Sequence, residues 1–69
     1  MELSARNQLK GRVTRITRGG VVAELAIDIG NGQQIVSVIT NGSVQRLNLS
    51  EGSEVTAIIK ATEVMLATD

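Results

Sequence analysis

A β-hairpin is encoded in the stretch VVAELAIDIGNGQQIVSVIT, residues 21–40. Apolar side chains occupy alternate positions from Val21 to Ile29, with acidic residues between them, which predicts a strand with one buried face. The tripeptide Gly30-Asn31-Gly32 is typical of a tight turn, because Gly and Asn adopt positive φ at little cost. Residues 33–40 then form another strand. Its β-branched side chains lie on both faces, so we expect both faces to be covered.

The residues before the hairpin predict a strand that pairs with it. Leu9, Gly11 and Val13 alternate with polar residues, which again indicates one buried face. A glycine inside a strand indicates a close backbone approach or a bend. The alternation slips at Arg15-Ile16, where a β-bulge would move Ile16 to the inner face. Arg18-Gly19-Gly20 is then a turn into the hairpin.

The residues after the hairpin first change period. Val44 and Leu47 are three apart, which predicts a helix of about two turns, with Asn41 or Ser43 available to cap it. The polar run Ser50-Glu51-Gly52-Ser53 ends this segment.

Two more strands are predicted beyond that point. Val55, Ala57 and Ile59 alternate with more polar positions in a fourth strand, and residues 63–67 read as a short fifth strand. The order β-β-β-α-β-β in one domain, residues 1–69, is that of an oligonucleotide/oligosaccharide-binding (OB) barrel, an all-β fold of five strands with one short helix.

Composition excludes several kinds of chemistry. The chain has no histidine, cysteine or aromatic residue, and therefore no imidazole base, no thiolate nucleophile and no ordinary transition-metal site. Its seven carboxylates are scattered, unlike those of a calcium loop. Lys60 is the only candidate nucleophile, so we expect no enzyme and no metal bound directly as a cation.

Length and hydropathy predict a soluble oligomer. A chain of 69 residues buries a small fraction of its surface, and disulfides and zinc cannot reinforce this one. We therefore expect it to bury surface against copies of itself. No apolar run approaches the ~18–20 residues of a membrane span, and Met1-Glu2-Leu3-Ser4 begins no signal-peptide core. A cytoplasmic location, with no membrane partner, is the expectation.

Single-stranded nucleic-acid binding is the alternative function that the fold suggests. Small OB barrels bind single strands by stacking bases on aromatic side chains above a basic groove. Five of the seven cations lie between Arg6 and Arg18, but the net charge is zero and no aromatic residue is present. We therefore expect no nucleic-acid partner. A purely structural assembly subunit is a third possibility.

Polar donors at the predicted strand ends and helix start indicate a small oxyanion as ligand. They are a guanidinium, an ammonium and hydroxyls, which together suit such an anion. Taken singly, each is more often a helix cap or a solvated strand end than an anion ligand, and spacing along the sequence does not show that they converge. The residues are Ser4, Arg6, Thr40, Ser43, Lys60 and Thr62.

Three segments resemble the molybdenum-pterin-binding proteins, or molbindins. They are the opening SARNQLKG at residues 4–11, the segment TNGSV at residues 40–44, and GSEVTAIIKATEVM at residues 52–65. The resemblance covers essentially the whole chain. It implies an OB-type barrel that binds molybdate or tungstate as the bare oxyanion, for storage or homeostasis of molybdenum. It also implies a homo-oligomer, a hexamer built as a trimer of dimers, with strands exchanged between dimer partners and oxyanions held between subunits.

The resemblance also assigns the oxyanion ligands. Carried over by position, they are Ser4 and Arg6, Thr40 and Ser43, and Lys60 with Ala61. Many relatives have Ser at the last position, whereas Ala61 offers only its backbone N–H. Molybdate is a tetrahedral dianion that needs hydrogen-bond donors and cations, not metal ligands, so the lack of His and Cys is no obstacle. No feature of this sequence supports binding of a pterin, because no aromatic residue is present to stack on its ring.

Overall fold

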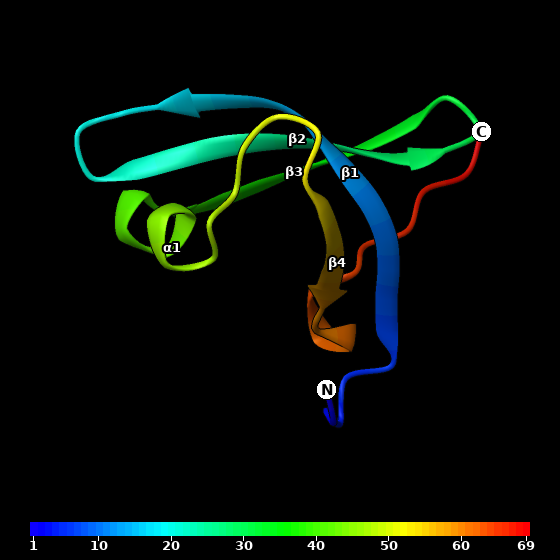
Figure 1. Ribbon diagram of the computed structural model, residues 1–69. Helices are drawn as coiled ribbons and strands as arrows, with labels where there is room; N and C mark the ends of the chain where they lie inside the picture. Colours follow the sequence, from blue (N-terminus) through cyan, green and yellow to red (C-terminus); the bar gives the residue numbers. More distant parts are fainter.

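A single antiparallel sheet of four strands makes up most of the molecule. The structure, a computed structural model, describes residues 1–69. Figure 1 shows the sheet strongly curled into a half-barrel, with α1 at one end. The strand order is β3-β2-β1-β4. The elements are β1 (Asn7–Arg18), β2 (Val22–Gly30), β3 (Gln33–Thr40), α1 (Asn41–Arg46), β4 (Glu54–Ile59) and the short 3₁₀ helix η1 (Ala61–Glu63).

The predicted hairpin is confirmed as β2 and β3. Asn31 and Gly32 have φ values of 56° and 72°, the positive pair that a tight turn between twisted strands requires. Ile27 lies opposite Ile35, and the pairing continues to Val22 opposite Thr40. The turn therefore fixes a register that places the apolar positions of both strands on the same face.

The long strand β1 joins the two halves of the sheet because it pairs with β2 along one part and with β4 along the other. A bulge interrupts its register between Val13 and Arg15, one residue before the predicted slip. The predicted close approach at Gly11 is also confirmed. A Cβ there would lie 2.7 Å from the carbonyl oxygen of Asp28, so only glycine lets β1 lie this close to β2 at the bend.

The hydrophobic core lies on the concave face of the sheet and under α1. It consists of Val13, Ala23, Leu25, Ile27 and Val44. Only six residues of the chain are buried, too few for an independent core of normal size. We expected both faces of β3 to be covered, but within one chain its outer face is not. Val36 and Val38 on that face are 56% and 61% exposed.

The helix differs from its prediction at both ends. Its N-cap is Thr40, the last residue of β3, whose Oγ1 accepts a hydrogen bond from the Ser43 N–H at 3.0 Å. Asn41 and Ser43 were therefore the wrong choices. The helix ends at Arg46, because Asn48 adopts a φ of 54° and turns the chain back toward β4. Leu47 is left exposed, and Leu49 packs on the core in its place.

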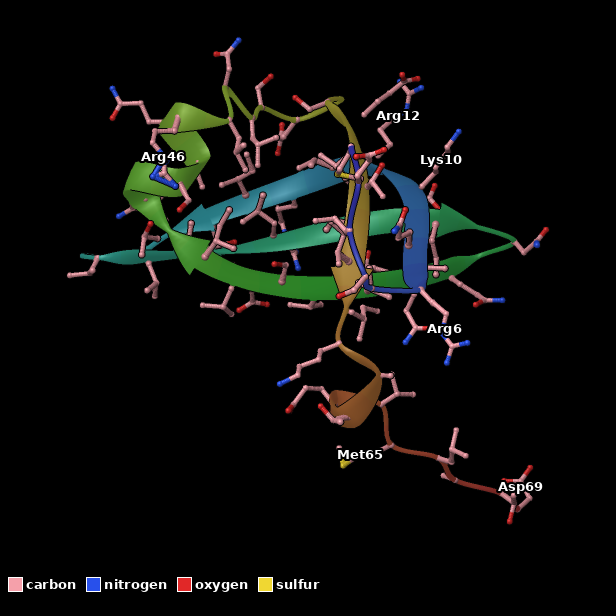
Figure 2. The ribbon with its side chains drawn as sticks, turned by 90° about the horizontal axis from the view of Figure 1, so that it is seen from below. Arg6, Lys10, Arg12, Arg46, Met65 and Asp69 are labelled. Carbon is pink, nitrogen blue, oxygen red and sulfur yellow. The ribbon has the colours of Figure 1, made fainter.

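The predicted fifth strand is not found in the single chain. The structure has a 3₁₀ turn at Ala61–Glu63 and no strand after it. This turn directs residues 64–69 away from the sheet, and Figure 2 shows Met65 and Asp69 on a segment that leaves the body of the molecule. Met65 and Leu66 are each 92% exposed. These residues pair with no strand of their own chain.

No helix is long and apolar enough to cross a membrane.

Candidate oxyanion site

The ends of β1 and β4 bring four of the predicted ligands together. Asn7, at the start of β1, pairs with Ile59, at the end of β4. The residues just before β1 therefore lie beside those just after β4. They line one open cleft, which is formed by Ser4, Ala5, Arg6, Asn7, Ile58, Lys60, Ala61 and Thr62. We call it the terminal cleft.

The terminal cleft offers positive charge and hydrogen-bond donors. Arg6 and Lys60 are its two cations, and none of its lining residues is a carboxylate. The only ion pair in the chain lies elsewhere, between Arg12 and Glu54, so neither cation is neutralised. Ala61 is the first residue of η1, where backbone N–H groups have no partner inside the helix. Its N–H is thus a free donor, although its methyl group adds none.

Thr40 and Ser43, the remaining predicted ligands, form a second group at α1. The Thr40 hydroxyl accepts from the Ser43 N–H and donates to the Ser43 Oγ at 2.9 Å. Arg46 joins them by donating from Nη2 to the same Ser43 Oγ at 3.1 Å. We call these three residues the helix triad.

The terminal cleft and the helix triad are separate within one chain. Figure 2 shows Arg46 of the triad and Arg6 of the cleft on opposite sides of the molecule. Thr40 and Ser43 are not among the residues that line the cleft. The six predicted ligands therefore form two half-sets, each at a different end of the sheet.

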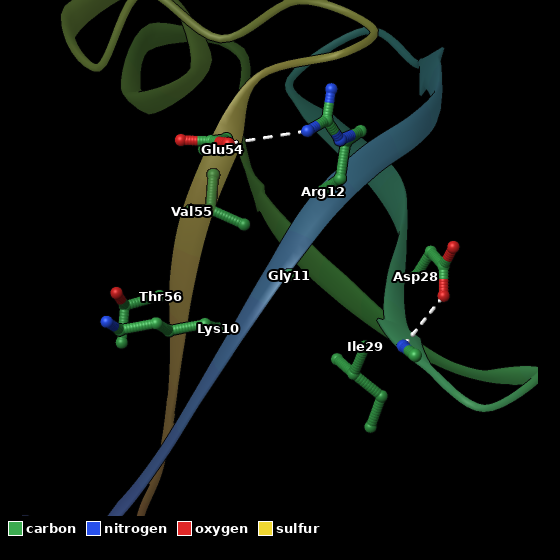
Figure 3. A pocket seen from close by; sticks show the side chains of 9 residues that line it. Lys10, Gly11, Arg12, Asp28, Ile29, Glu54, Val55 and Thr56 are labelled. Carbon is green, nitrogen blue, oxygen red and sulfur yellow. Dashed lines mark hydrogen bonds and ion pairs between the residues drawn. The ribbon is translucent and has the colours of Figure 1, made fainter.

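A second cavity, the mixed-charge cavity, lies over the bend of β1. Lys10, Arg12, Asp28 and Glu54 line it around Gly11 (Figure 3). Arg12 is paired with Glu54 at 3.3 Å, and Asp28 accepts a hydrogen bond from the Gly30 N–H at 2.8 Å. Since its two cations are matched by two carboxylates, this cavity is a poor candidate for a dianion.

An apolar groove runs along the open, concave side of the half-barrel. Apolar side chains of β3 and β4 line its two sides, among them Ile35, Ile39, Val55 and Ile59. The groove lies between the two edge strands of the sheet, where an additional strand would find unpaired backbone groups.

Sequence reasoning missed Arg46. The signal was present, because residues three apart on a helix are neighbours and Ser43 had already been selected. Asn7 also lines the terminal cleft but was not selected, and its place beside Ile59 follows only from the strand register. No group of three or more His, Cys, Asp or Glu side chains could hold a metal ion.

Comparisons with known proteins agree with this architecture. The TOBE domain family matches residues 3–66. A probable molybdenum-pterin-binding protein of Haemophilus influenzae is 49% identical over 69 residues, which are 100% of both chains. A molybdate binding protein from Sporomusa ovata is 40% identical with a TM-score of 0.91, over 99% of this chain and 100% of that one. ModG, described as a cytoplasmic molybdate-binding protein, is 43% identical with a TM-score of 0.83, over 88% of this chain and 43% of ModG.

The curled sheet, its short helix and its cationic strand ends define a small β-rich binding module. The chain also matches relatives of the same size over their full length, which places it in one group within its family. The chain belongs to the TOBE domain family and, within it, to the molybdenum-pterin-binding proteins, or molbindins.

Proposed function

We propose that this protein binds molybdate, and tungstate, as the intact tetrahedral oxyanion and thereby stores molybdenum in the cytoplasm. The observation that carries the proposal is the terminal cleft, where Arg6 and Lys60 stand without any carboxylate. An unpaired dianion is costly to remove from water, so a site for it needs cations and donors within hydrogen-bond reach. Ser4 and the Ala61 N–H supply neutral donors in the same cleft.

The second half of the site comes, in this proposal, from another copy of the chain. Thr40 and Ser43 lie at the far end of the sheet from the terminal cleft, so one chain alone cannot place all six ligands around one small anion. Two copies packed with the cleft of one against the helix triad of the other would complete the shell. The complete site is thus Ser4, Arg6, Lys60 and Ala61 of one copy with Thr40 and Ser43 of its partner.

The same association accounts for the apolar groove and the exposed C-terminal segment. Residues 64–67 have no strand partner in their own chain and expose Met65 and Leu66. The groove between β3 and β4 offers two unpaired strand edges and an apolar floor. We propose that each copy inserts this segment into its partner's groove as the fifth strand, and that three such dimers form a hexamer. The exposed Val36 and Val38 on the outer face of β3 supply further apolar surface for the assembly.

Binding without catalysis is the function that the donor set favours. Lys60, the one candidate nucleophile, has no carboxylate or histidine beside it in the cleft to act as a base, and no group of His, Cys, Asp or Glu side chains there could hold a metal ion. The relatives of this chain are named for what they bind. The alternative, single-stranded nucleic-acid binding, lacks a stacking surface because the chain has no aromatic residue.

Isothermal titration calorimetry tests the proposal. The assembled protein should bind molybdate and tungstate and discriminate against sulfate, which is a smaller tetrahedral dianion and fits a shell of fixed radius less well. Equal, weak heats for molybdate and sulfate would show that the cleft attracts any dianion by charge alone, and the proposal would be wrong.

A further inference from the structure

Arg46 occupies a position that the molybdate site as proposed does not use. It lies in the last turn of α1, three residues after Ser43, and its Nη2 donates to the Ser43 Oγ at 3.1 Å. We propose that Arg46 is a further ligand of the bound oxyanion and that its charge makes the site prefer dianions to monoanions of the same shape. This inference rests on the proposed function and adds a specificity-determining residue to it.

The hydrogen bonds of the helix triad leave the Ser43 proton free. A hydroxyl has one proton to donate and two lone pairs that accept. The Ser43 Oγ accepts from both Thr40 and Arg46, so its lone pairs are occupied and its own O–H points away from them. In the single chain the Thr40 hydroxyl accepts from the Ser43 N–H and donates its one proton to the Ser43 Oγ, so Thr40 serves as a ligand only when it turns that proton from Ser43 to the anion. Ser43 therefore presents its O–H to a ligand. An anion can accept this hydrogen bond, whereas a cation cannot.

Arg46 adds charge and further donors at the same point. A guanidinium has five N–H donors, of which one is spent on Ser43. Its side chain takes no part in the only ion pair of the chain, and α1 has no acidic residue. The guanidinium is exposed in the single chain, so a neighbouring copy's anion can reach it without any rearrangement of the core. Arg46 also fixes Ser43 in the orientation that directs its proton outward.

The charge of Arg46 predicts how it discriminates between anions. Coulomb attraction scales with the charge of the ligand. Loss of one cation therefore reduces the binding free energy of a dianion about twice as much as that of a monoanion. Molybdate and perrhenate suit this comparison, because both are tetrahedral oxyanions of similar size that carry two and one negative charges. In affinity, the factor lost for molybdate should be about the square of the factor lost for perrhenate.

Titration of the assembled protein with molybdate and perrhenate tests the inference, with Arg46→Gln compared with Arg15→Gln. Arg15 is also exposed and forms no ion pair, so both variants lose one equivalent charge. Arg46→Gln should bind molybdate about tenfold more weakly, as expected for a hydrogen bond to a charged group, and perrhenate about threefold more weakly. Arg15→Gln should stay within about twofold of the unsubstituted protein for both anions.

The outcomes separate this inference from the proposed function. If the unsubstituted protein binds no molybdate, the proposed function itself fails. If it binds molybdate and Arg46→Gln behaves like Arg15→Gln, the function stands and the role of Arg46 is refuted. A third variant, Arg46→Lys, keeps the charge and should keep the preference for molybdate over perrhenate. A preference as low as that of Arg46→Gln would show that charge is not the cause.

Discussion

Replacing Lys60 with alanine is the substitution that bears most directly on the terminal cleft. Lys60 follows β4 and shares the cleft with Arg6, where no carboxylate competes for its ammonium group. When a partner copy closes the cleft over a dianion, the ammonium becomes one member of a desolvated charge pair. Removal of one member of such a pair costs about 3 kcal/mol or more, which corresponds to a loss of affinity of more than about a hundredfold.

Lys10 provides the matched control. It is exposed on β1 and lines the mixed-charge cavity with Asp28 and Glu54. Lys10→Ala removes the same side chain and the same charge, so the change in net charge cancels from the comparison. An exposed charge is worth about 1 kcal/mol or less, and molybdate affinity should fall by no more than about fivefold.

Calorimetry on both variants measures the difference, after sedimentation has shown that each variant assembles as the unsubstituted protein does. The reasoning requires a severe loss for Lys60→Ala and a small one for Lys10→Ala. Equal and small losses would mean that binding is diffuse electrostatic attraction, and the assignment of the cleft would be refuted.

Three further outcomes are expected. Gly11→Ala should lower the free energy of unfolding by about 1–3 kcal/mol in thermal melting, because its Cβ would meet the Asp28 carbonyl oxygen at 2.7 Å. Gly20→Ala has open space around it and should leave that free energy within about 1 kcal/mol, so equal effects would refute the close packing at the bend. Deletion of residues 64–69 should dissociate the assembly in sedimentation experiments, and an unchanged assembly would exclude strand exchange through this segment. Fluorescence anisotropy should detect no binding of single-stranded oligonucleotides at physiological salt. Submicromolar affinity would favour nucleic-acid binding over molybdate binding as the function.

Local pattern was sufficient to predict the parts of the fold whose partners lie close in sequence. The two strands of the hairpin can pair in only one register. That register follows from the alternation between Val21 and Ile29, from a turn with two positive φ values and from the β-branched strand after it. The bulge in β1 was predicted within one residue because Ile16 had to reach the inner face. These features depend on side chains and turn geometry that the hairpin itself contains.

The errors occurred where structure depends on a choice between local partners or on groups outside the chain. Thr40 caps α1 instead of Asn41 or Ser43, because the last residue of β3 is already extended, as an N-cap must be. Residues 63–67 have strand-like composition but pair with no strand of their own chain. A strand needs a partner, and sequence pattern alone does not say which molecule supplies it.

The candidate site was predictable in its residue types and only partly in its geometry. Donors and cations at strand ends indicated an anion, whereas their assignment as ligands came from the resemblance to molbindins. The gathering of Arg6 with Lys60 depends on the register of β1 against β4, which spacing along the chain does not reveal. Arg46 was missed because it was considered neither with Ser43 nor with the predicted strand ends.

Anomalous diffraction at the molybdenum absorption edge, from crystals grown with molybdate, would test the central claim most directly. The account predicts a molybdenum peak between subunits, with its oxygens within hydrogen-bond distance of Arg6 and Lys60 of one copy and of Ser43 of another. A peak in the mixed-charge cavity around Gly11, or a peak enclosed by a single chain, would contradict it.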